Sequence, residues 1–226
     1  DVDLVNILDP EIDEITGDAR ESVEEMPDRV IFAEHECGHL ITAMLADRKV
    51  VKFEVPRSVK KAKTGQEYMG VVRSGNPDLS DPELRNVEEE IVHTAFCLLG
   101  GPVVTQLVID PDADFDSAFS ILAEWGDTKV LNQKLEDCPA FKGDKEEFIR
   151  AMTKELIEFF KDEEVEALAQ DLAGLILERD NIEDLENGIN EEILQYLQEK
   201  GHDLGSIRAK YEKMAEKGKE ILAKQR

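Results

Sequence analysis

Residues 35 to 39 read His-Glu-Cys-Gly-His and lie within a strongly apolar stretch of the sequence. Between Asp28 and Asp47 the hydrophobic residues recur at helical spacing, and Asp28 can cap the start of a helix. On such a helix His35 and His39 are one turn apart and project from the same face, where two imidazoles can bind one divalent metal ion. The sequence therefore predicts a buried helix of about five turns that carries a metal site.

Glu36 projects beside the two histidines, within reach of a water molecule on the metal. Zinc lowers the pKa of such a water toward about 7, and a neighbouring Glu can take its proton when a carbonyl is attacked. The pattern therefore favours zinc as cofactor and Glu36 as catalytic base. The alternative is an ordinary helix in which the histidines form local hydrogen bonds and Glu36 is solvated.

A catalytic zinc ion also needs a third protein ligand. No His or Glu follows the motif at the short distances of the commonest zinc proteases. The most concentrated source of candidates is an acidic run before a later predicted helix, formed by Asp110, Asp112, Asp114 and Asp116. Capping and favourable interaction with the helix dipole could also explain some of these acids, so the spacing leaves the third ligand open.

The chain has a formal net charge of −25 at pH 7, which argues against nucleic acid or an anionic membrane as partner. Its 3 cysteines form no Cys-x-x-Cys pair, which indicates a reducing compartment, and we expect a cytoplasmic protein. No signal peptide and no uninterrupted apolar run long enough for a membrane span are visible.

Hydrophobic periodicity predicts a mainly α fold with a small β-hairpin or sheet and a C-terminal helical bundle. We expect strands at 50–55 and 68–72. A helix is expected from Asp81-Pro82, interrupted at Gly100-Gly101-Pro102 and continued on a new axis over 103–109. The acidic run opens a helix that reaches Trp125. Further helices are expected at 146–161, 163–179, 189–200 and 204–224.

The composition divides the chain into three parts. Residues 1–27 form an acidic N-terminal extension, residues 28–200 a metal-site domain, and residues 201–226 a basic C-terminal helix. We expect that helix to pack on an acidic neighbour, with a partner or second subunit as the alternative.

The order of these signals resembles the peptidase domain of the FtsH-type membrane-anchored AAA zinc metalloproteases. The resemblance is carried by Ala33 to His39, Pro56-Arg57, Tyr68-Met69-Gly70, Leu98 to Gly101 and the acidic helix start, and it covers about residues 28–200. In that family an Asp followed by an apolar residue, with Ala four places on, supplies the third zinc ligand. The resemblance therefore implies His35, His39 and Asp114 on Zn²⁺ and Glu36 as base.

Departures from the family limit what is carried over. Cys37 stands where a small residue is usual, and Pro102 and Thr105-Gln106 replace an Arg and a pair of Glu. The sequence contains no phosphate-binding loop of an ATPase. The resemblance thus implies a zinc-dependent endopeptidase that cuts unfolded proteins or peptides, as a homo-oligomer or with a separate ATPase partner. The alternative is a non-catalytic regulatory or protein-binding relative that keeps the scaffold.

Overall fold

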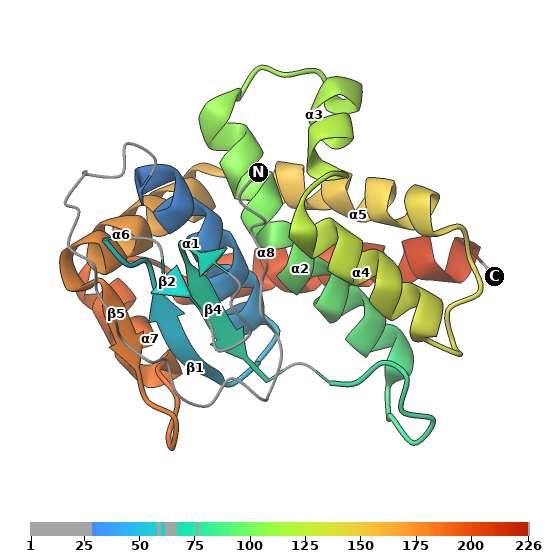
Figure 1. Ribbon diagram of the computed structural model, residues 1–226, viewed down its shortest axis with the longest axis horizontal. Helices are drawn as coiled ribbons and strands as arrows, with labels where there is room; N and C mark the ends of the chain where they lie inside the picture. Colours follow the sequence, from blue (N-terminus) through green and yellow to red (C-terminus); the bar gives the residue numbers. More distant parts are fainter. Residues whose placement is uncertain (1–28, 58–59, 62–66, 76, 226) are drawn as a thin grey trace.

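The computed structural model describes residues 29–57, 60–61, 67–75 and 77–225, and the expected N-terminal extension lies outside them. The protein is mainly helical with a small three-stranded antiparallel sheet, which confirms the predicted fold class (Figure 1). The elements are α1 (Arg29–Leu45), β1 (Val50–Glu54), β2 (Lys60–Lys61), β3 (Glu67–Tyr68), β4 (Val71–Ser74), α2 (Val87–Ile109), α3 (Phe115–Leu122), α4 (Gly126–Asp137), α5 (Lys145–Phe160), α6 (Glu163–Arg179), β5 (Asn181–Glu183), α7 (Asn190–Glu199) and α8 (Leu204–Lys224).

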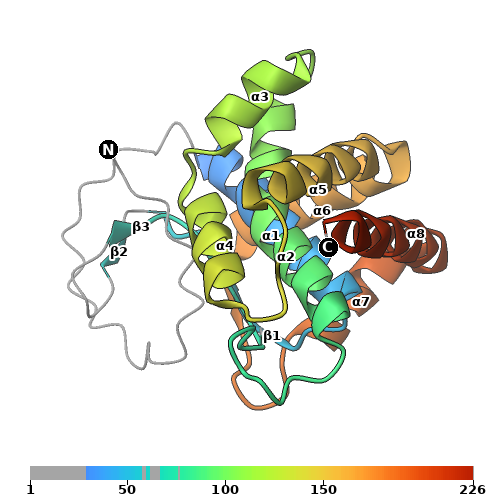
Figure 2. The same cartoon turned by 90° about the vertical axis from the view of Figure 1, so that its right-hand side faces the viewer.

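Helices α1 and α2 form the centre of the molecule, and the other elements pack around them (Figure 2). Both helices are buried along most of their length, because their apolar residues are not confined to one stripe. Their backbones cross closely at Gly38 and Gly100. A methyl group added to Gly100 would lie 2.4 Å from the carbonyl oxygen of Gly38. Only glycine fits at this crossing.

Helix α2 runs without interruption through Gly100, Gly101 and Pro102, so the predicted break at these residues is wrong. Glycine and proline weaken a helix in isolation, but burial against α1 outweighs these local preferences. The helix also begins later than predicted, at Val87, after Asn86 in a left-handed conformation. One continuous helix therefore faces α1 at the crossing.

Replacing Gly100 by Ala is expected to lower the free energy of unfolding by about 1–3 kcal/mol, because the new methyl group meets a backbone carbonyl that cannot move aside. The matched control is Gly174→Ala in α6, where nothing lies within 4 Å of the added methyl. That variant should gain up to about 1 kcal/mol from helix propensity. Denaturant unfolding measures both, and equal stability of the two variants would contradict the close crossing.

The sheet has the strand order β4-β1-β5, with Phe53 of β1 paired to Val72 of β4 and to Ile182 of β5. The strand β5 was not predicted, since three residues between helices carry no periodic signal. The predicted strand at 68–72 is divided between β3, which pairs with β2, and β4, which pairs with β1. Within the described part of the chain, the other edge of β4 is joined to no strand.

The region after the acidic run also differs from the prediction. The helix that was expected to reach Trp125 ends at Leu122, and a separate helix, α4, follows from Gly126. Trp125 is the residue that precedes α4. Helix α4 was not predicted, because its polar composition gives a weak apolar pattern, although Leu131 and Leu135 are buried.

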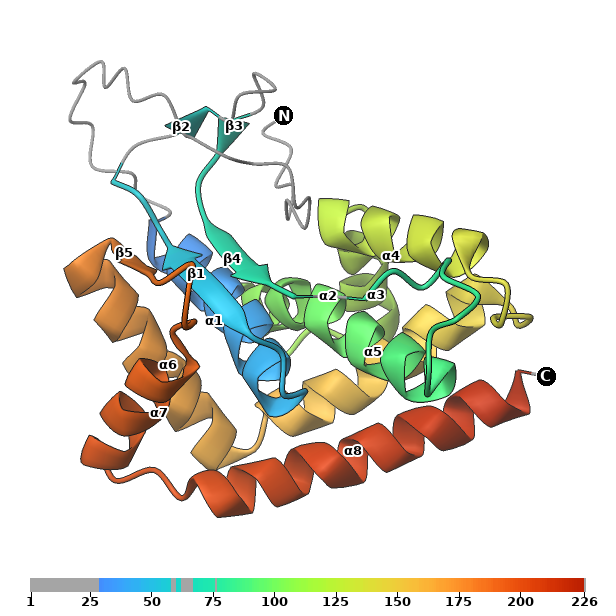
Figure 3. The ribbon, with the colours of Figure 1, turned by 90° about the horizontal axis from the view of Figure 1, so that it is seen from below.

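Helix α8 lies along the side of the molecule opposite β2 and β3 (Figure 3). Its apolar residues Ile207, Tyr211, Met214 and Leu222 are buried. Its basic residues form ion pairs with acids of the neighbouring helices and loops: Arg208 with Asp47, Lys210 with Asp162 and Glu164, Lys217 with Glu155, and Lys219 with Glu89. The C-terminal helix thus packs on acidic neighbours, as predicted.

Among the described residues, α2 is the helix that is long and apolar enough to cross a membrane. Of its apolar window, 83% is buried inside the protein. A helix at the centre of a globular core has the same length and composition, so α2 is weak evidence for a membrane span.

Candidate metal centre

Helix α1 brings the three residues of the predicted motif to the centre of the protein. His35, Glu36 and His39 are 3%, 6% and 2% exposed, respectively. The Nε2 atoms of the two histidines are 3.0 Å apart, and the rings meet edge to face. The spacing of four residues therefore places both imidazoles at one point, as predicted. Cys37, on another face of α1, packs in the hydrophobic core.

Helix α2 fixes which nitrogen of each imidazole carries hydrogen. The Nδ1 atom of His39 lies 2.7 Å from the carbonyl oxygen of Cys97, which can only accept a hydrogen bond. The Nδ1 atom of His35 lies 3.0 Å from the hydroxyl of Thr105, which itself donates to the carbonyl of Gly101. Each Nδ1 is therefore the donor, so in the neutral rings both Nε2 atoms present a lone pair.

The third member of the site is Asp127, in the first turn of α4. One of its carboxylate oxygens lies 3.4 Å from Nε2 of His35 and 3.7 Å from Nε2 of His39. Asp127 is fully buried, and neither of its carboxylate oxygens has a hydrogen-bond partner. The ligand atoms of the three residues lie within 4.8 Å of one another. This buried group could hold a metal ion.

A cation resolves an otherwise unfavourable arrangement of acceptors. Two imidazole lone pairs and a carboxylate share a space without solvent, and a buried charge without a partner is costly. The charges of these residues also shift one another's pKa values. Burial alone would raise the pKa of Asp127, but the charges of His39 and His35 lower it. Burial favours neutral His39, yet Asp127 and Glu36 raise its pKa. Burial lowers the pKa of His35.

The predicted ligand Asp114 is not part of this group. It is exposed and caps the start of α3, where its carboxylate accepts hydrogen bonds from the backbone N–H groups of Asp116 and Ser117. Asp127, and not the predicted Asp114, lies beside the two histidines in the structure. The other residues of the acidic run, Asp110, Asp112 and Asp116, are exposed as well. The capping alternative describes Asp114 correctly.

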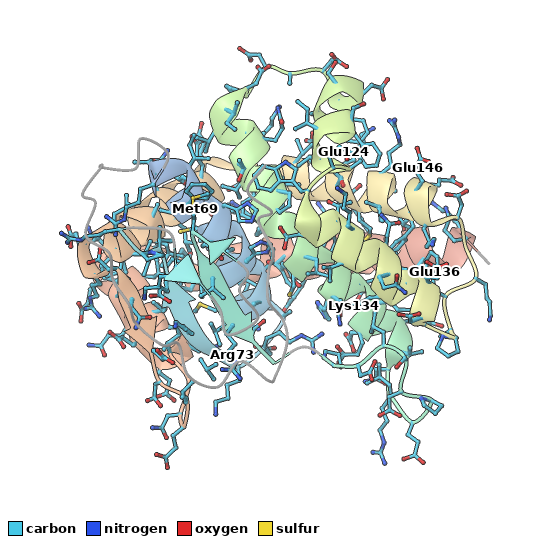
Figure 4. The ribbon with its side chains drawn as sticks, in the orientation of Figure 1. Met69, Arg73, Glu124, Lys134, Glu136 and Glu146 are labelled. Atoms are coloured by element: carbon cyan, nitrogen blue, oxygen red, sulfur yellow. The ribbon has the colours of Figure 1, made fainter. Side chains whose placement is uncertain are left out.

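A pattern in the sequence could have indicated Asp127. Asp127, Leu131 and Leu135 are four residues apart, so they share one face of α4, and all three are buried. Glu136 lies on the exposed side of the same helix (Figure 4). A single acid in line with an apolar stripe must be buried with a partner, which distinguishes it from a solvated acid.

Glu36 is held beside the site by the strand β4. The backbone of Val72 forms a hydrogen bond with its carboxylate, whereas Oε2 is buried and has no hydrogen-bond partner. A methyl group added to Gly70 would lie 2.6 Å from the Glu36 carboxylate, so the chain passes directly against it. Burial raises the pKa of Glu36 to about 8. A divalent cation nearby would oppose this rise and favour the carboxylate.

The two imidazoles are enclosed between α2 and α4. On one side, a methyl group added to Gly101 would lie 2.3 Å from Nε2 of His39 and 2.8 Å from Nε2 of His35. On the other, the indole of Trp125 stacks on the ring of His35, with centroids 4.8 Å apart and planes 16° from parallel. Gly101 and Trp125 are features of the site that the sequence analysis did not identify.

The arrangement offers two nitrogen ligands, one carboxylate ligand and a neighbouring carboxylate that is not a ligand. Three protein ligands that leave a position for water are typical of catalytic rather than structural zinc. No protein-family model matches the sequence, and no curated protein matches it either.

Proposed function

We propose that this protein is a zinc-dependent endopeptidase that hydrolyses peptide bonds in unfolded proteins or peptides. The observation that carries the proposal is the fully buried carboxylate of Asp127, 3.4 Å from Nε2 of His35 and 3.7 Å from Nε2 of His39, with Glu36 beside them. Two imidazole nitrogens and a carboxylate oxygen that converge in a buried space are a ligand set suited to a divalent cation.

The donor set fits zinc. Two imidazole nitrogens and one carboxylate oxygen are ligands that zinc takes in hydrolases, whereas Mg²⁺ and Ca²⁺ prefer sites built from oxygen alone. Bound there, zinc would supply a Lewis acid that polarises a carbonyl and acidifies a water molecule. Cys97 and Thr105 would hold the imidazoles in the tautomer that ligation requires.

Glu36 would serve as the general base. Its carboxylate accepts the proton of the attacking water and passes it to the amine that leaves when the peptide bond breaks. The hydrogen bond from the Val72 backbone orients one oxygen, which leaves Oε2 for the proton. Gly70 allows the backbone to lie close enough for this contact.

The edge of β4 that is unpaired among the described strands is the reason for proposing a peptide as substrate. It pairs with β1 on one side, and in the described part of the chain its other edge is joined to no strand. An extended peptide can add to such an edge through backbone hydrogen bonds. Because Val72 on this strand contacts Glu36, a peptide bound there would lie beside the base. Folded proteins rarely offer an extended segment, so unfolded chains are the proposed substrates. The expected homo-oligomer and separate ATPase partner stay predictions.

Removal of metal tests the proposal. We expect the purified chain to contain one zinc ion, to lose cleavage of an unstructured protein such as casein on treatment with a chelator, and to regain it with Zn²⁺. His93→Ala, which removes a histidine that hydrogen-bonds Tyr211 away from the site, is the control and should behave as wild type. Casein cleavage at an undiminished rate by metal-free protein would refute the proposal. Stoichiometric zinc without cleavage would favour a non-catalytic module.

A further inference from the structure

The two histidines of the site are held in different ways. His39 donates to a backbone carbonyl, that of Cys97, whose position α2 fixes. His35 donates to the hydroxyl of Thr105, a side-chain group that in turn donates to the carbonyl of Gly101. A contact with the face of the His35 ring would restrain its plane in addition to the hydrogen bond at Nδ1.

Trp125 provides a contact of that kind. Its indole lies nearly parallel to the His35 ring and covers one face of it. It stands two residues before Asp127, where α4 begins, so one turn of the chain carries both the ligand carboxylate and the stacking plane. The position of Asp127 relative to His35 is thus linked to the stacking of Trp125.

We propose that Trp125 is a positioning residue for the metal ligand His35. Its indole face holds the imidazole in the plane in which Nε2 points at the same place as Nε2 of His39 and the carboxylate of Asp127. This inference rests on the metal site of the proposed function but not on proteolysis. It also gives the protein a built-in reporter, because Trp125 is the single tryptophan of the chain. Its emission comes from a ring in direct contact with a ligand.

Zinc titration of the metal-free wild-type chain provides the first test. Tryptophan emission should change and saturate at one equivalent of Zn²⁺, and His35→Ala should abolish the change. The second test is zinc affinity, measured by competition with a chelator. Trp125→Ala should weaken zinc affinity about tenfold, since the aromatic stack that supports the ligand His35 is lost. Trp125→Phe, which keeps a stacking ring, should stay within about threefold of wild type.

A matched control separates positioning from general stability. Phe115→Ala removes an aromatic stack of similar kind, between Phe115 and Phe119 of α3, without touching His35. It should lower the melting temperature and leave zinc affinity unchanged. If Trp125→Ala fails to fold, Trp125→Leu fills the same space without a ring plane and should weaken zinc binding as alanine would.

The outcomes distinguish the inference from the metal site itself. Stoichiometric zinc binding with unchanged tryptophan emission and equal affinity in wild type, Trp125→Ala and Trp125→Leu would overturn the positioning role and leave the metal site standing. A wild-type chain that binds no zinc by direct metal analysis would overturn both.

Discussion

Replacing Glu36 by Gln is expected to lower kcat for casein cleavage at least about 100-fold while the zinc content stays as in wild type. The amide keeps the shape of the side chain but cannot accept a proton. Because Glu36 is not among the three residues that could bind the metal, its charge can be removed without removing a ligand. Cleavage is followed by release of labelled peptides, and zinc by elemental analysis.

The control for this variant is Glu34→Gln, which makes the same change two residues earlier on α1. Glu34 is partly buried against other elements and outside the group of metal ligands. It should retain both zinc and activity. Glu36→Gln with wild-type kcat would remove Glu36 from the reaction, whatever the metal content.

Asp127→Asn should weaken zinc binding more than about 100-fold. This effect is larger than the usual loss when a residue that only hydrogen-bonds a metal ligand is removed. The amide is nearly isosteric with the carboxylate, so the fold is kept while the negative charge opposite the two imidazoles is lost. Activity should fall with the metal. Zinc affinity by chelator competition and the melting temperature measure the two effects separately.

Asp114→Asn is the matched comparison, because the family resemblance implies Asp114 and the structure places Asp127 beside the two histidines. Asparagine caps helices about as well as aspartate, so α3 should be unaffected. We expect zinc affinity and stability close to wild type. Loss of zinc in Asp114→Asn with its retention in Asp127→Asn would restore the ligand that the family resemblance implies.

The sequence predicts those residues of the site that are close together along the chain. His35, Glu36 and His39 lie within five consecutive positions, and helical geometry alone brings them together. Asp127 reaches them through the packing of α4 against α2, which depends on contacts distant in the sequence. Asp114 and Asp127 both stand at the start of a helix, so this signal does not separate a cap from a ligand.

The fold shows the same division between local and distant effects. The amphipathic helices α5 to α8 lie where periodicity placed them, within about one residue of the predicted bounds. The errors concern segments whose conformation is set by neighbours. Residues 100–102 stay helical because α1 packs against them, and β5 forms because β1 is beside it. Neither neighbour is visible in a window of the sequence.

The unbroken course of α2 couples the two imidazoles. The carbonyl of Cys97 and the hydroxyl of Thr105, which accept the Nδ1 hydrogens, are about 12 Å apart along one continuous helix. Any axial slide of α2 against α1 would displace both acceptors by the same amount. The two rings would then lose the hydrogen bonds that fix their tautomers together rather than one at a time.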